Sequence, residues 1–362
     1  MVCCLVFRGS TSPTTLPSSV ERATPLESTL AYLYQNIGLY PSLESTLTRN
    51  RGRGCPLPRS VRQFAPPTLA LIATLLFACF AAASASFGAT LDQAKAAIQT
   101  RISQSGADVA IAFQTLNGKQ EWFLRADEPF HAASTMKIPV MIELYRQARE
   151  GKLKLSDPLP IKNEFHSIVD GSVFHLSASD DSEAALYQAE GQTRTLSQLC
   201  ELMITESSNL ATNLMIEKLG VENIRATVHT LGADGMNVLR GVEDQKAFDK
   251  GLNNTTTARA LLVLLRAIAN GSAVDQSSSR AMIAILERQK FNESIPAGLP
   301  AGIKVAHKTG EITKIHHDAA IVYAKRPFIL VILVRGMPDS KASAALMADI
   351  ARILYPEAEG VE

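Results

Sequence analysis

Apolar residues recur with strand-like or helical spacing at both ends of the segment that follows residue 90. Short apolar runs bounded by turn residues predict strands, whereas repeats at i, i+3, i+4 and i+7 predict helices. Residues 91–103 and 340–354 have the helical spacing. Asn117-Gly118 separates two strand-like runs and is typical of a hairpin turn. Strands are predicted at residues 108–116, 120–124, 303–309, 318–323 and 328–334.

The middle of the chain has a helical pattern. Thr195 and Gln198 match a capping box, which marks the start of a helix. The apolar pattern that follows breaks at Ser207-Ser208-Asn209 and resumes through Leu219. Further helices are predicted near residues 257–269 and 278–288, and the polar, aperiodic residues 240–254 predict a long loop. Long loops in compact domains often carry function.

These elements predict an α/β (α+β) sandwich. A five-stranded antiparallel sheet is built from both chain ends, carries flanking helices and receives an inserted all-α domain. We place the α/β part at about residues 86–130 and 300–362, and the all-α part at about residues 131–299. Hydrophobic residues make up 46% of the chain, enough to bury a core, and a net charge of +1 gives no support for nucleic-acid binding.

The N-terminal part is a different kind of sequence. Residues 1–67 contain seven Arg but no Lys or Asp, and we interpret them as a leader outside the domain, either an over-long gene prediction or a long targeting segment. Residues 68–85 are uncharged and apolar, follow Arg59 and Arg62, and end in Ala83-Ser84-Ala85. This order is typical of a secretory signal peptide. We therefore expect residues 86–362 to be exported to the periplasm or secreted; an uncleaved anchor and a lipid anchor at Cys79 are the alternatives.

The cysteines exclude a disulfide scaffold in the exported chain. Of five cysteines, only Cys200 lies beyond residue 85. It belongs to an apolar helical face, so we expect a buried thiol. No cysteine-based metal site is possible with one thiol, and no metal or cofactor is expected.

Ser134-Thr135-Met136-Lys137 stands where an apolar helical pattern begins. Residues three apart share one helix face, so the Lys137 amine can approach the Ser134 hydroxyl. A serine becomes a nucleophile when a base takes its proton, and lysine serves as that base only if its pKa is lowered. The motif alone is equally compatible with a helix start followed by a surface lysine.

Two further motifs follow in order, 73 and 101 residues apart. Ser207 and Asn209 lie at the break between two helices, where both side chains can point into a cleft. Lys308-Thr309-Gly310 ends a predicted strand. The lysine and the threonine hydroxyl suit a substrate carboxylate, and the absence of a side chain at Gly310 permits close approach of a ligand backbone.

The three motifs together resemble the penicillin-recognising serine enzymes, specifically the class A β-lactamases. The resemblance extends over roughly residues 91–355 and includes the surrounding segments FHAASTMKIPVMIELY, LCELMITESSNLATNLM and IPAGLPAGIKVAHKTG. It implies an α/β sandwich with an all-α domain and a site between them. The implied activity is β-lactam hydrolysis through an acyl-serine intermediate.

The resemblance also implies residue roles. Ser134 is the acylated nucleophile, Lys137 assists proton transfer, and Ser207 passes a proton to the leaving nitrogen. Asn209 holds the substrate amide and orients Lys137, while Lys308, Thr309 and Gly310 bind the substrate. The backbone N–H groups of Ser134 and Glu311 form the oxyanion hole.

Deacylation is where the sequence departs from the family pattern. The family places a glutamate in the long loop, closely followed by Leu-Asn, to activate water. Here Glu243 is one position later than usual, and the first Leu-Asn is Leu252-Asn253. The family's Arg–Asp clamp corresponds to Arg240 and Asn254, an uncharged partner. We expect Glu243 to be the base, with Asp244 and Asp249 as rivals and a solvated loop acid as the alternative.

The histidines have two interpretations. His316 and His317 follow Lys308-Thr309-Gly310 in either an ordinary hairpin or a site wall, and His317 lies near where the family places a second cation for the substrate carboxylate. His131 and His307 are interpreted as structural. Strand alternation points His307 away from the face of Lys308.

Three functions therefore stay open. The first is a β-lactamase; the second is a DD-peptidase or esterase-like serine hydrolase on the same scaffold; the third is a sensor that stays acylated. The expected partner is a small-molecule β-lactam or a cell-wall peptide, with no nucleic acid, no stable membrane partner and a monomeric protein.

Overall fold

The computed structural model describes residues 91–359. The predicted leader (residues 1–67) and signal peptide (residues 68–85) lie outside the described residues. Within the described part, no helix has the length and apolar character needed to cross a membrane.

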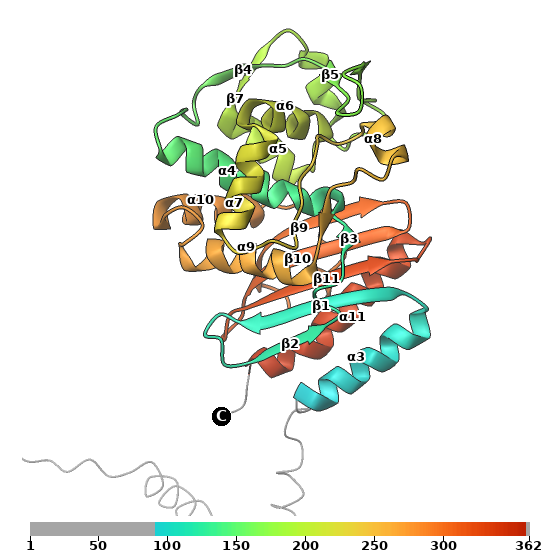
Figure 1. Ribbon diagram of the computed structural model, residues 1–362. Helices are drawn as coiled ribbons and strands as arrows, with labels where there is room; N and C mark the ends of the chain where they lie inside the picture. The colour runs from blue at the N-terminus through green and yellow to red at the C-terminus, as the bar shows by residue number, and fades with distance from the viewer. Residues whose placement is uncertain (1–90, 360–362) are drawn as a thin grey trace, which may run out of the picture. The chain divides into compact units, whose positions relative to one another are not determined.

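A five-stranded antiparallel sheet combines strands from both ends of the described chain (Figure 1). Its spatial order is β2-β1-β11-β10-β9. The predicted fold class is confirmed, because N-terminal β1 pairs with C-terminal β11 along its whole length. The strands are β1 (Asp108–Thr115), β2 (Glu121–Leu124), β9 (Lys304–Ile312), β10 (Ile315–Tyr323) and β11 (Phe328–Arg335).

Both faces of this sheet are buried. Along β11 the side chains alternate between two apolar clusters, with Val331 and Leu333 in one and Leu330 and Ile332 in the other. Successive side chains of a strand point to opposite faces. The apolar run of residues 328–334 is unbroken because the side chains on both faces of the sheet are buried.

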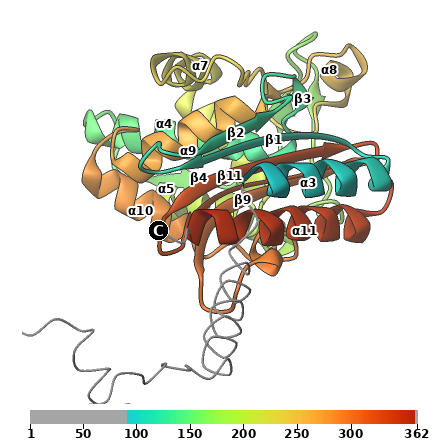
Figure 2. The same ribbon diagram turned by 90° about the horizontal axis from the view of Figure 1, so that it is seen from below.

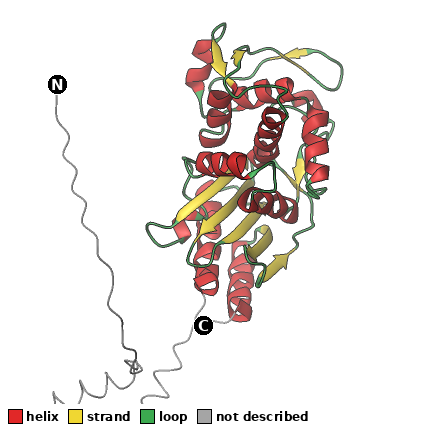
Figure 3. Ribbon diagram, turned by 90° about the vertical axis from the view of Figure 1, so that its left-hand side faces the viewer, coloured by secondary structure: helices red, strands yellow, loops and turns green. Residues whose placement is uncertain are grey.

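Helices cover the two faces. On one face α3 (Leu91–Ser105) and α11 (Ser340–Glu359) lie side by side, as Figure 2 shows. On the other face α9 (Ala258–Asn270) packs against β1, β10 and β11. The inserted helices lie on the same side of the sheet as α9, which is labelled in Figure 1; Figure 3 shows the sheet between two groups of helices.

The insertion between β2 and β9 is mainly helical. Its other helices are α4 (Lys137–Arg149), α5 (Leu196–Thr205), α6 (Asn209–Leu219), α7 (Val221–Thr230), α8 (Gln245–Asp249) and α10 (Gln276–Leu286), with 3-10 turns η1 (Ala133–Met136), η2 (Ala184–Ala189) and η3 (Pro296–Gly298). Its short strand pairs are β3 (Phe130–His131) with β8 (Thr255–Thr256), β4 (Pro158–Pro160) with β7 (Thr193–Thr195), and β5 (Phe165–His166) with β6 (Val173–Phe174).

Local sequence signals account for the helix boundaries. The predicted capping box of Thr195 and Gln198 is present in both directions at the start of α5. Helix α6 begins where the Ser208 hydroxyl accepts the Ala211 N–H, and it ends at Gly220, whose φ is +83°. Such a φ is costly for residues with a side chain. The break in the apolar pattern is therefore a real interruption between two helices.

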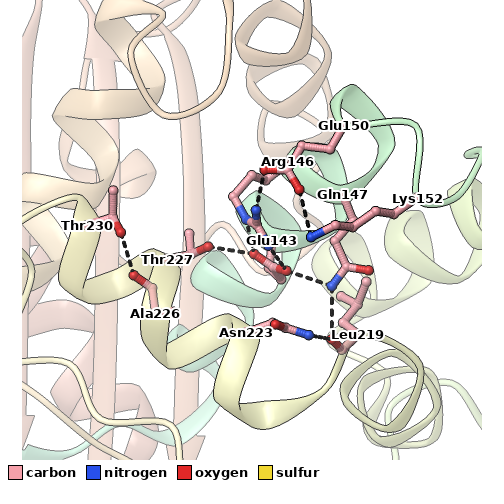
Figure 4. A network of polar contacts seen from close by, with 10 residues as sticks. All are labelled: Glu143, Arg146, Gln147, Glu150, Lys152, Leu219, Asn223, Ala226, Thr227 and Thr230. Carbon is pink, nitrogen blue, oxygen red and sulfur yellow. Dashed lines mark hydrogen bonds and ion pairs between the residues drawn. The ribbon is translucent and has the colours of Figure 1, made fainter.

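A buried carboxylate holds the helix that follows Ser134 (Figure 4). Glu143 of α4 is fully buried and accepts hydrogen bonds from Arg146, from Gln147 at 2.6 Å and from the Thr227 hydroxyl of α7 at 2.5 Å. Gln147 also donates to the Leu219 carbonyl at the end of α6. A buried charge persists only when it is paired and hydrogen-bonded. This network therefore fixes α4 against α6 and α7.

Candidate active site

Ser134 lies in a strained turn between β3 and α4. The preceding Ala133 has φ +45°, a left-handed conformation that non-glycine residues rarely adopt. The His131 Nδ1 accepts the Ala133 N–H at 3.0 Å, and the buried Thr135 hydroxyl donates to the Ala132 carbonyl at 2.5 Å. Among the described residues, Ser207 and Glu243 also have positive φ, at +58° and +62°. Strain of this kind is concentrated at functional sites.

Gly310 lines the cleft beside Ser134, and the structure gives a second reason for its small size. A Cβ placed on Gly310 would lie 2.9 Å from the Ser134 nitrogen and 3.0 Å from the Thr135 nitrogen. Contacts that short require the backbone to move. Gly310 therefore lets β9 touch the turn that carries Ser134.

Lys137 is the buried centre of the motif residues. It is fully buried, and its Nζ donates to the Ser207 carbonyl at 2.5 Å and to Asn209 Oδ1 at 2.8 Å. Burial lowers its pKa to about 7, against the opposing effect of the Asp181 and Glu243 carboxylates. A desolvated amine with this pKa is partly neutral near pH 7 and can accept a proton.

Ser207 stands between two lysines. Its hydroxyl oxygen lies 3.0 Å from Lys308 Nζ and 3.3 Å from Lys137 Nζ. Lys308 is also fully buried, and its pKa is held well below the ordinary range by burial and by the charge of Lys137. Ser207 can therefore pass a proton between groups on either side of it.

Asp181 is a site residue that the sequence reasoning missed. Its Oδ2 accepts the N–H groups of Asn209 and Leu210, both at 2.9 Å, and the Tyr187 hydroxyl at 2.9 Å. A carboxylate is stabilised at the N-terminus of a helix, so Asp181 holds the start of α6, where Asn209 lies. It belongs to an irregular segment that has no periodic signal in the sequence.

Among the acids of the long loop, Glu243 is the one that contacts a residue of the three motifs. Its Oε1 accepts the Asn209 Nδ2–H at 2.6 Å. Desolvation in the cleft wall raises its pKa, and the hydrogen bond from Asn209 opposes that rise. The two rival acids contact other groups. Asp244 caps the N-terminus of α8 and accepts a hydrogen bond from the Ser167 hydroxyl, and Asp249 accepts one from the Gln245 side chain.

The two ends of the loop of residues 240–254 are held together without the family's Arg–Asp ion pair, because residue 254 is Asn. Asn254 accepts the N–H groups of Leu239 and Arg240, and its own Nδ2 donates to the Arg240 carbonyl at 3.0 Å. The Arg240 side chain donates to the Leu252 carbonyl at 2.8 Å. Hydrogen bonds to the Asn254 side chain and to backbone carbonyls therefore close the loop in place of an ion pair.

His317 does not contact the cleft, so its predicted role as a second cation is wrong. It is fully buried, its Nε2 lies 2.9 Å from the His131 carbonyl and its Nδ1 accepts the Val334 N–H. Burial lowers its pKa to about 4, which keeps the ring neutral. The neighbouring His316 lines the cleft instead, and its Nδ1 has no hydrogen-bond partner among the described residues.

The predictions that His307 and Cys200 are buried structural residues are confirmed. His307 Nδ1 lies 2.9 Å from Asp318 Oδ1 in the buried interior. Cys200 is buried, and desolvation raises its pKa to about 12, so it stays a thiol.

Two adjoining cavities of about 370 and 740 Å³ meet at Ser134. The smaller one is also lined by Ser207 and Thr309, and the larger one by Glu243. Glu311 borders both, with its side chain exposed. The structure thus brings the three motifs and the loop acid to one cleft between the sheet and the helical insertion.

Comparison with known proteins agrees with this arrangement. The beta-lactamase enzyme family matches residues 93–358. Over 303 residues the chain is 25% identical to Beta-lactamase CTX-M-25 of Escherichia coli, covering 82% of this chain and 98% of that protein. It is 28% identical to the beta-lactamase of Bacillus licheniformis over 167 residues, which are 44% of this chain and about half (54%) of that relative.

A solved structure supports the same relationship. The crystal structure of the beta-lactamase from Sphaerobacter thermophilus matches with a TM-score of 0.65 at 25% identity, covering 74% of this chain and 98% of that one. The family match spans most of the chain and includes every motif described above. The chain therefore belongs to the class A beta-lactamase family of serine hydrolases.

Proposed function

We propose that this protein hydrolyses β-lactams through an acyl-serine intermediate on Ser134. The observation that carries the proposal is one continuous set of hydrogen bonds. It runs from Lys308 through Ser207, Lys137 and Asn209 to Glu243, beside the cavities that meet at Ser134.

In acylation, the neutral Lys137 amine takes the Ser134 proton, and Oγ bonds to the β-lactam carbonyl carbon. The ring C–N bond breaks, and Ser207 passes a proton from Lys137 to the leaving nitrogen. The oxyanion is met by the N–H groups of Ser134 and Glu311, donors that contribute about 3 kcal/mol each to such transition states. Lys308 and Thr309 receive the substrate carboxylate.

In deacylation, Glu243 takes a proton from water, and the oxygen of that water attacks the ester carbonyl. The Ser134–acyl bond breaks, the proton returns to Ser134, and the ring-opened acid leaves. The contact between Glu243 and Asn209 at 2.6 Å supports this role, because it directs the carboxylate toward the motif residues. This contact favours a β-lactamase over the peptidase and sensor alternatives.

The test is mass spectrometry of the purified protein over time with a penicillin and a cephalosporin, alongside the absorbance of the drug. We expect an adduct on Ser134 that appears and disappears while drug is consumed many times over. Glu243→Gln should trap the adduct by slowing its release about 10²–10⁴-fold, the usual contribution of a general base. A wild-type adduct that persists at one equivalent would refute the β-lactamase and select the DD-peptidase or the sensor.

We also propose that residues 86–362 are the exported form. The support is the apolar segment at residues 68–85, which follows Arg62 and ends in the small residues Ala83-Ser84-Ala85. N-terminal sequencing of the protein from a cell envelope fraction should find a start near residue 86. A start at Met1 would contradict this.

A further inference from the structure

Two neutral histidines connect the Ser134 turn to the sheet. The first, His131, ends β3 and accepts the Ala133 N–H on its Nδ1 at 3.0 Å. The second, His317 of β10, has its Nε2 2.9 Å from the His131 carbonyl. Its Nδ1 in turn accepts the Val334 N–H of β11 at 3.1 Å. The chain of contacts therefore runs from the middle of the sheet to the residue before Ser134.

The direction of each hydrogen bond determines where the protons are. Because the Val334 N–H donates to His317 Nδ1, the proton of that ring is on Nε2, which donates to the His131 carbonyl. Because the Ala133 N–H donates to His131 Nδ1, that nitrogen carries no proton. Burial lowers the pKa of both rings, so both are neutral near pH 7.

The contacts act at the strained point of the turn. Ala133 keeps φ +45° although it has a side chain, and such a conformation persists only where the surroundings hold it. On the opposite side, β9 lies so close that a Cβ on Gly310 would be 3.1 Å from Ala133 Cβ. A small relaxation of Ala133 would therefore displace Ser134 from its position against β9.

We infer that His131 and His317 are positioning residues, which hold the backbone of Ala133 and Ser134 in the geometry required for attack. The inference rests on the proposed function in so far as Ser134 is the nucleophile. Neither ring has to contact substrate for this role. The feature that matters in His131 is an acceptor at the position of Nδ1, not a titratable ring.

The test compares two substitutions of His131. In His131→Asn the side-chain oxygen occupies about the place of Nδ1 and can accept the same N–H, whereas His131→Leu has no acceptor. The matched control is His229→Leu, at an exposed histidine of α7 that lies away from the cleft. His317 is fully buried, and its replacement risks the fold, so the test does not depend on it. Circular dichroism and thermal melting check that each variant is folded.

Two measurements report the reactivity of Ser134. The first is the acylation rate constant with a penicillin under single-turnover conditions, together with the dissociation constant of the non-covalent complex. The second is phosphonylation by an aryl phosphonate monoester, in which Ser134 Oγ bonds to phosphorus and the phenolate leaves. This second reaction needs the activated serine but no β-lactam.

For His131→Leu we expect both rate constants to fall about tenfold, the effect of one lost hydrogen bond, with an unchanged dissociation constant. His131→Asn should stay within about twofold of wild type by the same reasoning. Wild-type rates in His131→Leu, or an equal loss in both variants, would overturn the inference. If no β-lactam acylates the wild type but phosphonylation follows the expected order, the proposed function fails and the positioning role stands.

Discussion

Replacing Lys137 by methionine tests whether this amine is a desolvated base. Its pKa is about 7 in the folded protein against 10.5 as the ordinary value. Because the folded pKa is the lower one, the unfolded chain binds more protons between pH 7 and pH 10.5. Stability must therefore rise with pH across this window, as the penalty for burying the amine is relieved.

The size of this effect follows from the two pKa values. At pH 7 the penalty is roughly 4 kcal/mol, and at pH 9 it is roughly 2 kcal/mol. Wild type should therefore gain about 2 kcal/mol of unfolding free energy from Lys137 between pH 7 and pH 9. Lys137→Met has no amine to bury and therefore avoids the penalty of roughly 4 kcal/mol at pH 7. It also loses the hydrogen bonds of Lys137 to Ser207 and Asn209, which lowers its unfolding free energy by about 1 kcal/mol for each bond.

The assay is guanidinium unfolding of both proteins at pH 7, 8 and 9. Lys308 is also buried with a lowered pKa, so both proteins gain stability with pH. The Lys137 charge is one cause of that lowered pKa, so the difference between the two proteins reports Lys137 together with its effect on Lys308. We expect Lys137→Met to be more stable at pH 7 by about 2 kcal/mol while its acylation rate falls at least about 10²-fold. Equal pH dependence in the two proteins would refute the reasoning, because Lys137 would then titrate alike in the folded and unfolded chains.

Three further changes probe the supports of the site. Gly310→Ala should reduce acylation about 100-fold in a protein that still folds, since its Cβ meets the Ser134 nitrogen; an unchanged rate constant would show that the turn moves freely. Asp181→Asn removes a carboxylate that raises the pKa of Lys137, so the acid limb of the acylation–pH profile should move to lower pH, and an unmoved limb would contradict this. Glu143→Leu leaves the buried donors of Gln147 and Thr227 without an acceptor and should lower the unfolding free energy by about 3 kcal/mol. A loss of less than about 1 kcal/mol in guanidinium unfolding would contradict this.

The sequence alone was sufficient for most of the fold because the signals are local. The short apolar runs located every strand of the main sheet, and the capping box and the break at Ser207 located the start of α5 and the boundary between α5 and α6. The three motifs also identified the cleft, because each joins reactive residue types at a spacing that one helix start, one helix break or one strand can present. Lys308-Thr309-Gly310 lies within β9 and not at its end as predicted, because the pairing with β10 continues to Ile312.

Tertiary structure decided what depends on register and on long-range contacts. Adjacent residues of a strand face opposite sides, so only the pairing of His317 with Gly310 and of His316 with Glu311 shows which histidine lines the cleft. Asp181 has no signal in the sequence, because its role arises from the N–H groups of a helix that begins 28 residues later. The sequence favoured Glu243 as the loop base but left Asp244 and Asp249 as rivals. The hydrogen bond from Asn209, 34 residues away, shows that Glu243 is the one that contacts the motif residues.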